Sequence, residues 1–310
     1  MKSQKAPYPL NVWAALGILY VVWGSTYLAI RFAVESIPPF LMAGTRFVTA
    51  GLLLYAWARL RGAPRPTLAH WKSAGVIGLF LLVLSNGGVC WAEQKVASGV
   101  ASLLVATVPL WMAILQWSWK GEAKPGGKAW LGIGLGLAGL AVLVFSRGGV
   151  GAGAVDPWNA LLLAGASLCW SVGSLYACSA VLPDSAFLAT SMEMLAGGAM
   201  QWGVGLLLGE ASRFHPAAVT TQSLQSLVYL TLVGSLLGFT SFIWVLQKSN
   251  PTLASTYAFV NPVIAVFLGC FWGGETLSGP VFLAASLIVA AVTLIILSSG
   301  PGKGRAASRS

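Results

Sequence analysis

Ten long apolar segments constrain the fold of this chain more than any other feature of its sequence. Each is close to the 20 or so residues that a helix needs to cross the hydrocarbon core of a bilayer. The runs are continuously apolar and do not alternate, which favours helices over the strands of a β-barrel. The predicted spans are residues 12–30, 40–58, 73–92, 96–119, 129–146, 158–180, 186–208, 224–246, 252–273 and 279–298.

The composition excludes a soluble protein. Hydrophobic residues make up 57% of the 310 residues and charged residues 8%, against roughly 25% charged residues in an ordinary soluble domain. Inside the ten spans only Arg46 and Glu193 carry charge. We therefore predict an all-α integral membrane protein.

The distribution of Lys and Arg predicts the orientation in the membrane. One side would hold thirteen of the 18 basic residues and the other five. Because basic residues gather in cytoplasmic loops, both termini are predicted to be cytoplasmic. The formal charge of +10 then follows from topology, and its scatter over short loops argues against a nucleic-acid partner.

An internal repeat divides the chain into two halves. Residues 91–122 match residues 244–275 at a constant offset of 153, with ten identities in 32 positions, where about three would arise by chance. Residues 24–27 also match 173–176 in the pattern Gly-Ser-x-Tyr. Each half holds five spans, and an odd number reverses the chain between copies. We predict ten transmembrane helices in two inverted-topology five-helix repeats around a central cavity, an architecture typical of secondary transporters.

The domain boundaries follow from the repeat. Residues 1–146 form the first repeat and residues 158–298 the second. Residues 147–157, which are rich in glycine, form the linker between them. Residues 299–310 are predicted to be a disordered cytoplasmic tail.

The sequence offers no set of residues for catalysis, metal binding or a cofactor. The string Gly134-Leu-Gly-Leu-Ala-Gly139 satisfies the dinucleotide fingerprint, but it lies inside an apolar span with no preceding strand, so helix packing explains it better. The four cysteines all fall within apolar spans and form no C-x-x-C pair. No hydrolase, metalloprotease or P-loop motif is present. We expect no enzyme, no metal and no cofactor.

Two prolines near the middle of the membrane point to a site. Pro109 and Pro262 occupy matching repeat positions, and each removes a backbone donor and obstructs the carbonyl four residues earlier. Freed carbonyls at membrane depth persist where protein or a watery cavity satisfies them. A packing kink would explain one such proline, whereas a matched pair favours a site at the repeat interface.

Polar and aromatic residues cluster near these prolines and near the Gly-Ser-x-Tyr repeats. Aromatic side chains would close over a solute, and amide and hydroxyl groups would orient its polar ends. Helix packing and the interfacial aromatic belt are the competing explanations for these residues. The candidate solute-binding residues are Trp23, Ser25, Asn86, Ser102, Thr107, Trp170, Ser174, Trp244, Tyr257 and Asn261.

The two charged residues within the spans are costly at a helix centre, by about 2.5–3.5 kcal/mol on insertion scales, so both are expected to face the bundle interior. Aligned at an offset of 147, Arg46 and Glu193 occupy matching positions in the second and seventh helices. A structural role is one interpretation of both residues. As the only carboxylate inside a span, Glu193 is alternatively a candidate proton carrier.

The sequence resembles the EamA-type exporters of the drug/metabolite transporter superfamily, and within them the bacterial exporters of amino acids and metabolites. The resemblance covers nearly the whole chain. It rests on residues 23–27 (Trp-Gly-Ser-Thr-Tyr), on the proline- and arginine-containing run 38–47, and on residues 257–263 followed by Gly274-Glu-Thr-Leu277. It implies ten helices around a central cavity, with helices five and ten peripheral, and efflux from the cytoplasm.

Together these features predict a secondary transporter of the bacterial inner membrane that exports small amino acids, aromatic ones included, and related metabolites. A cavity with almost no fixed charge suits zwitterionic or neutral solutes. The partners would be such a solute and the lipid bilayer; the oligomeric state is left open. The alternatives are a polyspecific drug exporter and a membrane scaffold or sensor without flux.

Overall fold

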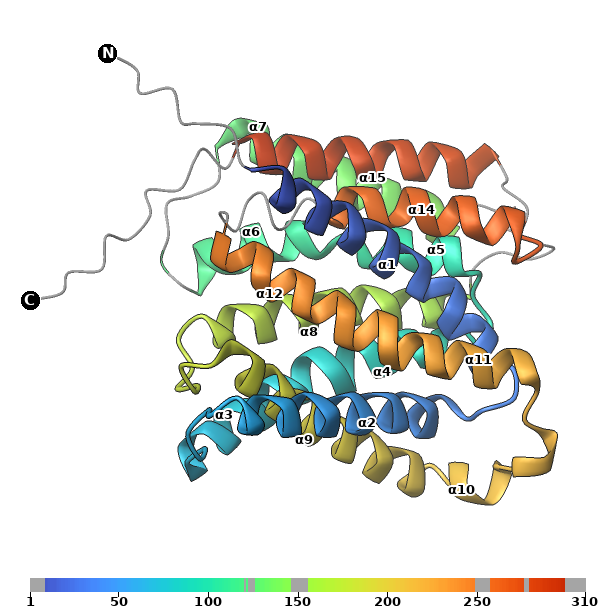
Figure 1. Cartoon of the computed structure of the whole chain (residues 1–310). Coiled ribbons are helices and arrows are strands. Elements are labelled where there is room, and N and C mark those ends of the chain that lie inside the picture. Colours follow the sequence, from blue (N-terminus) through green and yellow to red (C-terminus); the bar gives the residue numbers. More distant parts are fainter. Residues whose placement is uncertain are drawn as a thin grey trace, which may run out of the picture.

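The computed structural model describes residues 9–119, 121, 126–145, 156–248, 257–275 and 279–298. Every regular element within these ranges is a helix, and helices lie within all ten predicted spans (Figure 1). The fold class predicted from the apolar segments is therefore confirmed as all-helical. The beginning of α1 and the end of α15 lie at the same end of the bundle (Figure 1).

The helices of the first half are α1 (Leu10–Val34), α2 (Pro39–Leu60), α3 (Leu68–Gly78), the π-helix η1 (Leu79–Asn86), α4 (Gly87–Ala92), α5 (Ser98–Val105), α6 (Val108–Ser118) and α7 (Gly127–Phe145). Those of the second half are α8 (Pro157–Ala177), α9 (Ala186–Leu207), α10 (Glu210–Arg213), the short 3-10 helix η2 (Pro216–Ala218), α11 (Thr221–Tyr229), the π-helix η3 (Leu230–Leu237), α12 (Gly238–Lys248), α14 (Tyr257–Phe271) and α15 (Gly279–Ser298). The segments α3–η1–α4 and α11–η3–α12 each run on as one helical span.

Six of these helical segments are long and apolar enough to cross a membrane. They are Leu10–Val34, Pro39–Leu60, Leu68–Ala92, Ser98–Ser118, Pro157–Ala177 and Thr221–Phe242. Val260–Phe271 and Gly279–Ala291 are shorter apolar helices. The chain is thus a helical membrane protein, and the crossing of the membrane by all ten helices stays a prediction.

Local sequence signals set the starts of several helices. The side chains of Thr67, Asp156, Ser185 and Thr220 each accept a hydrogen bond from a backbone N–H in the first turn of the next helix. Such caps satisfy donors that an α-helix leaves free at its start. Because these residues lie in loops, they fix where the chain enters each helix.

Helix packing relates the two halves symmetrically. The helix α2 packs along α9, and α7 packs along α15. The helix α1 contacts α14, α11 and α12, while its counterpart α8 contacts α5, α6, α3, η1 and α4. The contact of α1 with α14 in one half corresponds to that of α8 with α5 and α6 in the other. The contacts of α1 with α11 and α12 correspond to those of α8 with α3, η1 and α4. Such matched contacts are expected for an internal repeat.

The positions of glycines with positive φ also match between the two halves. The glycines with positive φ among the described residues are Gly62 and Gly209, which are 147 positions apart, and Gly121 and Gly274, which are 153 apart. A left-handed residue favours glycine and commonly ends a helix. Equivalent helices of the two halves therefore end with the same backbone turn.

The predicted topology can be tested at two exposed arginines. Arg61 follows α2 and Arg213 ends α10. If the halves are inverted and both termini are cytoplasmic, Arg61→Cys in a cysteine-free chain will react with an impermeant maleimide only from the cytoplasmic side. Arg213→Cys will react only from the other side. Labelling of both from one side would contradict the topology.

Candidate solute-binding site

A cavity of about 110 Å³ lies between the two halves of the chain. The helices α1, α2, α5 and α6 and the segment from η1 to α4 contribute its walls from the first half, and α8, α12 and α14 contribute them from the second. The described lining residues are mainly apolar or aromatic, and Arg46 is the charged one among them. A cavity shared by both halves is the arrangement that the paired prolines predict.

The cavity wall includes six of the ten candidate residues. These are Trp23, Asn86, Ser102, Trp170, Tyr257 and Asn261, together with Pro262. The Trp23 ring makes edge contacts with Tyr257, at 4.9 Å between centroids, and with Phe239, at 5.4 Å. One wall is therefore an interlocked aromatic cluster drawn from α1, α12 and α14.

The other four candidates lie away from this wall. The hydroxyls of Ser25 and Tyr229 share a hydrogen bond of 2.7 Å and face a second hollow. Ser174 donates to a carbonyl of its own helix, and Thr107, in the turn between α5 and α6, donates to the carbonyl of Leu104. Trp244 packs beside a small apolar cluster that includes Val12 and Val245. A role for these four residues in contacting solute stays a prediction.

The two prolines behave differently. The helical span of Pro109 opens, because α5 ends at Val105 and α6 begins at Val108. The hydroxyls of Ser167 and Ser171 on α8 donate to the carbonyls of Leu104 and Val108, each at 3.1 Å, so side chains of α8 supply donors to the backbone around this opening. Pro262, by contrast, lies inside a continuous helix α14. The predicted local opening is thus found at the first proline only.

The π-helices η1 and η3 were not predicted, and both lie beside the cavity. They occupy residues 79–86 and 230–237, which largely overlap at the repeat offset of 153, and each is followed by a glycine. The buried side-chain amide of Gln201, on α9, donates a hydrogen bond of 2.7 Å to the carbonyl of Leu82 within η1. Extra backbone width of this kind is rare and frequently marks functional sites.

Arg46 is held in the cavity wall by η3. Its Nε donates to the hydroxyl of Ser235 at 2.8 Å, and its guanidinium carbon lies 4.7 Å from the centroid of the Phe47 ring. The residue is 3% exposed, and its Nη1 has no hydrogen-bond partner among the described residues. The prediction that Arg46 faces the bundle interior is confirmed.

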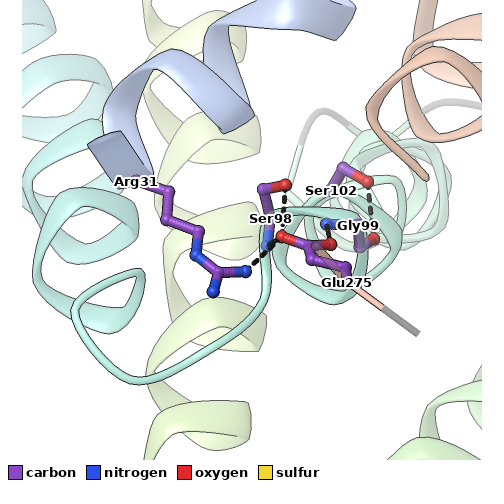
Figure 2. Close-up of polar contacts among 5 residues, drawn as sticks. All are labelled: Arg31, Ser98, Gly99, Ser102 and Glu275. Atoms are coloured by element: carbon purple, nitrogen blue, oxygen red, sulfur yellow. Dashed lines mark hydrogen bonds and ion pairs between the residues drawn. The ribbon is translucent and has the colours of Figure 1, made fainter. Parts of the chain in front are cut away.

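A second polar cluster lies at the end of the cavity-forming helices, and we call Arg31, Ser98, Gly99 and Glu275 the Glu275 cluster (Figure 2). Glu275 Oε1 accepts from the backbone N–H and the hydroxyl of Ser98, both at 2.7 Å, and its Oε2 accepts from the backbone N–H of Gly99 at 3.1 Å. Arg31 Nη1 forms an ion pair with Glu275 Oε1 at 2.5 Å. The carboxylate therefore caps α5 and ties it to α1 and α14.

Glycines make this geometry possible. Gly274, at φ 62°, turns the chain back after α14. A Cβ on Gly269 would overlap the Glu275 carboxylate, and one on Gly99 would lie 3.3 Å from it. Because the carboxylate needs this space, side chains at either position would push it away from the start of α5.

Further buried carboxyls lie at the same helix ends. Glu210 accepts from the backbone N–H groups at the start of α2, with 2.9 Å to that of Leu41. Glu93 directly follows α4, is 2% exposed, and makes no side-chain hydrogen bond within the described part of the chain. Burial, and then the charge of Glu275, raises the pKa of the Glu93 carboxyl well above its usual range, although Arg31 and Arg46 act in the opposite direction.

The sequence argument missed the four charged residues Arg31, Glu93, Glu210 and Glu275, because it treated charges between spans as exposed. The repeated Gly-Glu pair at 121–122 and 274–275 was the available signal. Glu122 itself lies outside the described residues.

Glu193 is not in the cavity wall. It lies on α9, where its backbone carbonyl packs against Gly78 of α3.

The EamA-like transporter family matches residues 11–145 and again residues 157–297. The chain belongs to this family. Its two matches coincide with the two halves defined by the repeat. A protein of this family is a membrane transporter, so the transport function inferred from the sequence is established at this level, with the solute left unspecified.

Individual relatives agree with the family. YedA of Escherichia coli, described as an uncharacterized inner membrane transporter, is 42% identical over 93% of this chain and 91% of its own length. An uncharacterized transporter of Synechocystis is 26% identical over 92% of this chain and 90% of its own length. A protein crystal structure with 21% identity superposes with a TM-score of 0.61, covering 93% of this chain and 97% of the other. That likeness shows a shared fold.

Proposed function

We propose that this EamA-family transporter exports small amino acids and related metabolites across the bacterial inner membrane by alternating access of two inverted repeats. The observation that carries the proposal is the cavity between the halves, whose wall combines aromatic rings, two amides and hydroxyls with a single described charge. Such a wall suits solutes that are zwitterionic or neutral overall. The exporting direction rests on the resemblance to EamA-type exporters.

The size of the cavity favours this proposal over a polyspecific drug exporter. Sites for drug-sized molecules occupy roughly 300–1,000 Å³, whereas this cavity holds about 110 Å³. A solute the size of alanine fits that space with limited movement of the walls, and phenylalanine requires a larger movement. A drug would require the halves to separate further before it could bind.

The symmetric helix pairing supports alternating access. In inverted repeats, the two halves exchange conformations, so that the site opens first to one side and then to the other. The pairings of α1 with α14 and of α8 with α5 and α6 are the contacts that such an exchange relates. The inner-membrane location is proposed from YedA, and both termini would face the cytoplasm.

Proteoliposomes that contain only the purified full-length chain test the function. We expect preloaded vesicles to exchange labelled alanine, threonine or phenylalanine in counterflow, with rates that saturate at low solute concentration. Empty vesicles and protein inactivated by heat are the controls. Flux of drugs alone would favour the drug exporter, and no flux of any amino acid would contradict the proposed substrate class.

The same vesicles test whether Glu193 carries protons. If it does, Glu193→Gln will abolish uptake driven by a pH gradient while counterflow survives, because counterflow needs no net proton movement. The conservative variant Glu193→Asp keeps a carboxyl at this position and should retain the gradient dependence. Unchanged behaviour of Glu193→Gln would leave this carboxyl with a structural role.

A further inference from the structure

Arg46 brings a positive charge into the cavity wall without a matching negative one. The ion pair between Arg31 and Glu275 is the one formed within the described residues, and Arg46 takes no part in it. A charged side chain at membrane depth is costly and ordinarily pairs with a partner or marks a solute pathway. The uncompensated charge of Arg46 is thus a feature that packing alone does not explain.

The surrounding residues hold the guanidinium in one orientation. Ser235 fixes Nε, Phe47 packs against the guanidinium, and a Cβ on Gly234 would approach Nη2 to 3.2 Å. Two of these neighbours come from η3, so the π-helix sets the position of Arg46. With Nε occupied and Nη2 confined, Nη1 keeps N–H groups that no described side chain accepts.

The nearest candidate for an internal counter-charge is Glu93. Its two carboxyl oxygens form no hydrogen bond within the described residues, so it does not contact Arg46 directly. Glu275, Arg31 and Arg46 are the charged groups that face it. Burial raises the pKa of the Glu93 carboxyl well above its usual range, and no ion pair joins this carboxyl to Arg46 within the described residues.

The backbone of η3 links Arg46 to the aromatic wall. Gly234 lies beside Nη2, and its carbonyl accepts a hydrogen bond of 3.3 Å from the indole N–H of Trp23. Trp23 in turn contacts the Tyr257 ring. A solute group at Arg46 would therefore have an aromatic surface next to it, on which its apolar part can pack.

We propose that Arg46, which lines the cavity and whose unpaired Nη1 is covered in this structure, binds the carboxylate of the transported solute once the wall around its guanidinium moves aside. This inference rests on the proposed function in taking the cavity as the solute site, and it narrows the substrate class to carboxylates. A guanidinium edge matches a carboxylate in charge and in planar geometry. Amides and amines of the same size would leave Nη1 unpaired, and the transporter should discriminate against them.

Binding is measured on the detergent-purified full-length protein by quenching of tryptophan fluorescence, since Trp23 and Trp170 line the cavity. The probes are alanine and phenylalanine, their amides, and N-acetylalanine, which keeps the carboxylate without the ammonium group. We expect the acids to bind about 10- to 100-fold more tightly than the amides, the range for a hydrogen bond to a charged group. Arg46→Gln should remove this difference.

Matched variants separate recognition from folding. Arg46→Lys keeps a charge and should preserve part of the acid preference, and Ser235→Ala should preserve most of it because Arg46 itself remains. Arg213→Gln removes an exposed arginine outside the cavity and should change nothing. Equal binding of acids and amides by the wild type, or an undiminished preference in a folded Arg46→Gln, would overturn the proposal. Binding of acids without any amino-acid transport would instead contradict the proposed function alone.

Discussion

Replacing Glu275 with alanine is expected to cost this protein about 2–5 kcal/mol of folding stability and most of its transport. The change removes three hydrogen bonds from Ser98 and Gly99 and the ion pair with Arg31. Unpaired buried donors cost roughly 1–3 kcal/mol each, and loss of one partner of a buried ion pair about 3–5 kcal/mol. About a third of the Arg31 side chain is exposed, so water can solvate the freed guanidinium. The energetic cost of losing the ion pair is therefore smaller than for a fully buried pair.

The effect on transport follows from where the cluster lies. The largest buried apolar cluster contains the end of α1, the end of α4 and the start of α5, with Ile30, Val89 and Val100 among its members. The Glu275 cluster joins the same helix ends, and we infer that it helps to close this end of the cavity. Without Glu275, α5 loses its polar contacts with α1 and with the end of α14, and the closed state is expected to lose stability relative to the open one.

Cysteine accessibility measures this closure. Ser102 lies in the cavity wall one turn after Ser98 and is 1% exposed. In a chain free of other cysteines, Ser102→Cys should react slowly with an impermeant maleimide added at the Glu275 end. Glu275→Gln, which keeps the shape of the side chain but loses the ion pair, should speed the reaction at least severalfold.

Glu210→Ala provides the matched control. Glu210 is also buried and caps a helix at the same end, but it holds α2 and has no arginine partner among the described contacts. It should lower stability without speeding the labelling of Ser102→Cys to the same extent. Equal acceleration by both variants would mean that general loosening, and not the Glu275 cluster, controls access.

The helical architecture could be predicted from the sequence because membrane insertion depends on features that are local and additive. A span of about 20 apolar residues specifies a helix whatever its neighbours do. The residues that line the cavity were harder to choose, since which face of a helix meets the cavity depends on packing. Ser25 and Ser174 lie on the right helices but bond to Tyr229 and to their own backbone.

The π-helices and the buried loop carboxylates show where local reasoning ends. Nothing in residues 79–86 or 230–237 distinguishes a π-helix from an α-helix, because the wider turn is stabilised by distant partners such as Gln201. Likewise, Glu275 looks like an exposed loop charge until the start of α5 is placed beside it. Only the repeated Gly-Glu pair hinted that this position was special.

Removing both Tyr257 and Asn261 should weaken solute binding by about 10- to 100-fold. Both residues line the cavity from α14. The Tyr257 ring contacts Trp23 and also Phe242, at 5.9 Å between centroids. An aromatic contact contributes about 0.5–1.5 kcal/mol beyond the area that it buries, and a hydrogen bond about as much. Loss of both contributions is expected to lower the affinity for the solute by one to two orders of magnitude.

Asn261 also stabilises the fold, and this contribution must be measured separately from its effect on solute binding. With its amide nitrogen turned toward two backbone carbonyls, it donates to Tyr257 at 3.1 Å and to Tyr20 at 3.3 Å. The bond to Tyr20 ties α14 to α1, and the bond to Tyr257 lies within α14, beside Pro262, where the helix lacks a backbone donor. Asn261→Ala alone should therefore lower the thermal unfolding temperature as well as the affinity.

Counterflow of labelled alanine and phenylalanine in proteoliposomes checks the double variant. Tyr257→Phe keeps the ring and should behave nearly as the wild type, whereas Tyr229→Ala removes a tyrosine that bonds to Ser25 outside the cavity wall. We expect KM to rise for both solutes in the double variant, and more for phenylalanine, because its ring packs on the aromatic wall. If a well-folded double variant keeps its KM and its maximal rate, the solute binds elsewhere in the bundle and the aromatic cluster serves only to pack α1 against α12 and α14.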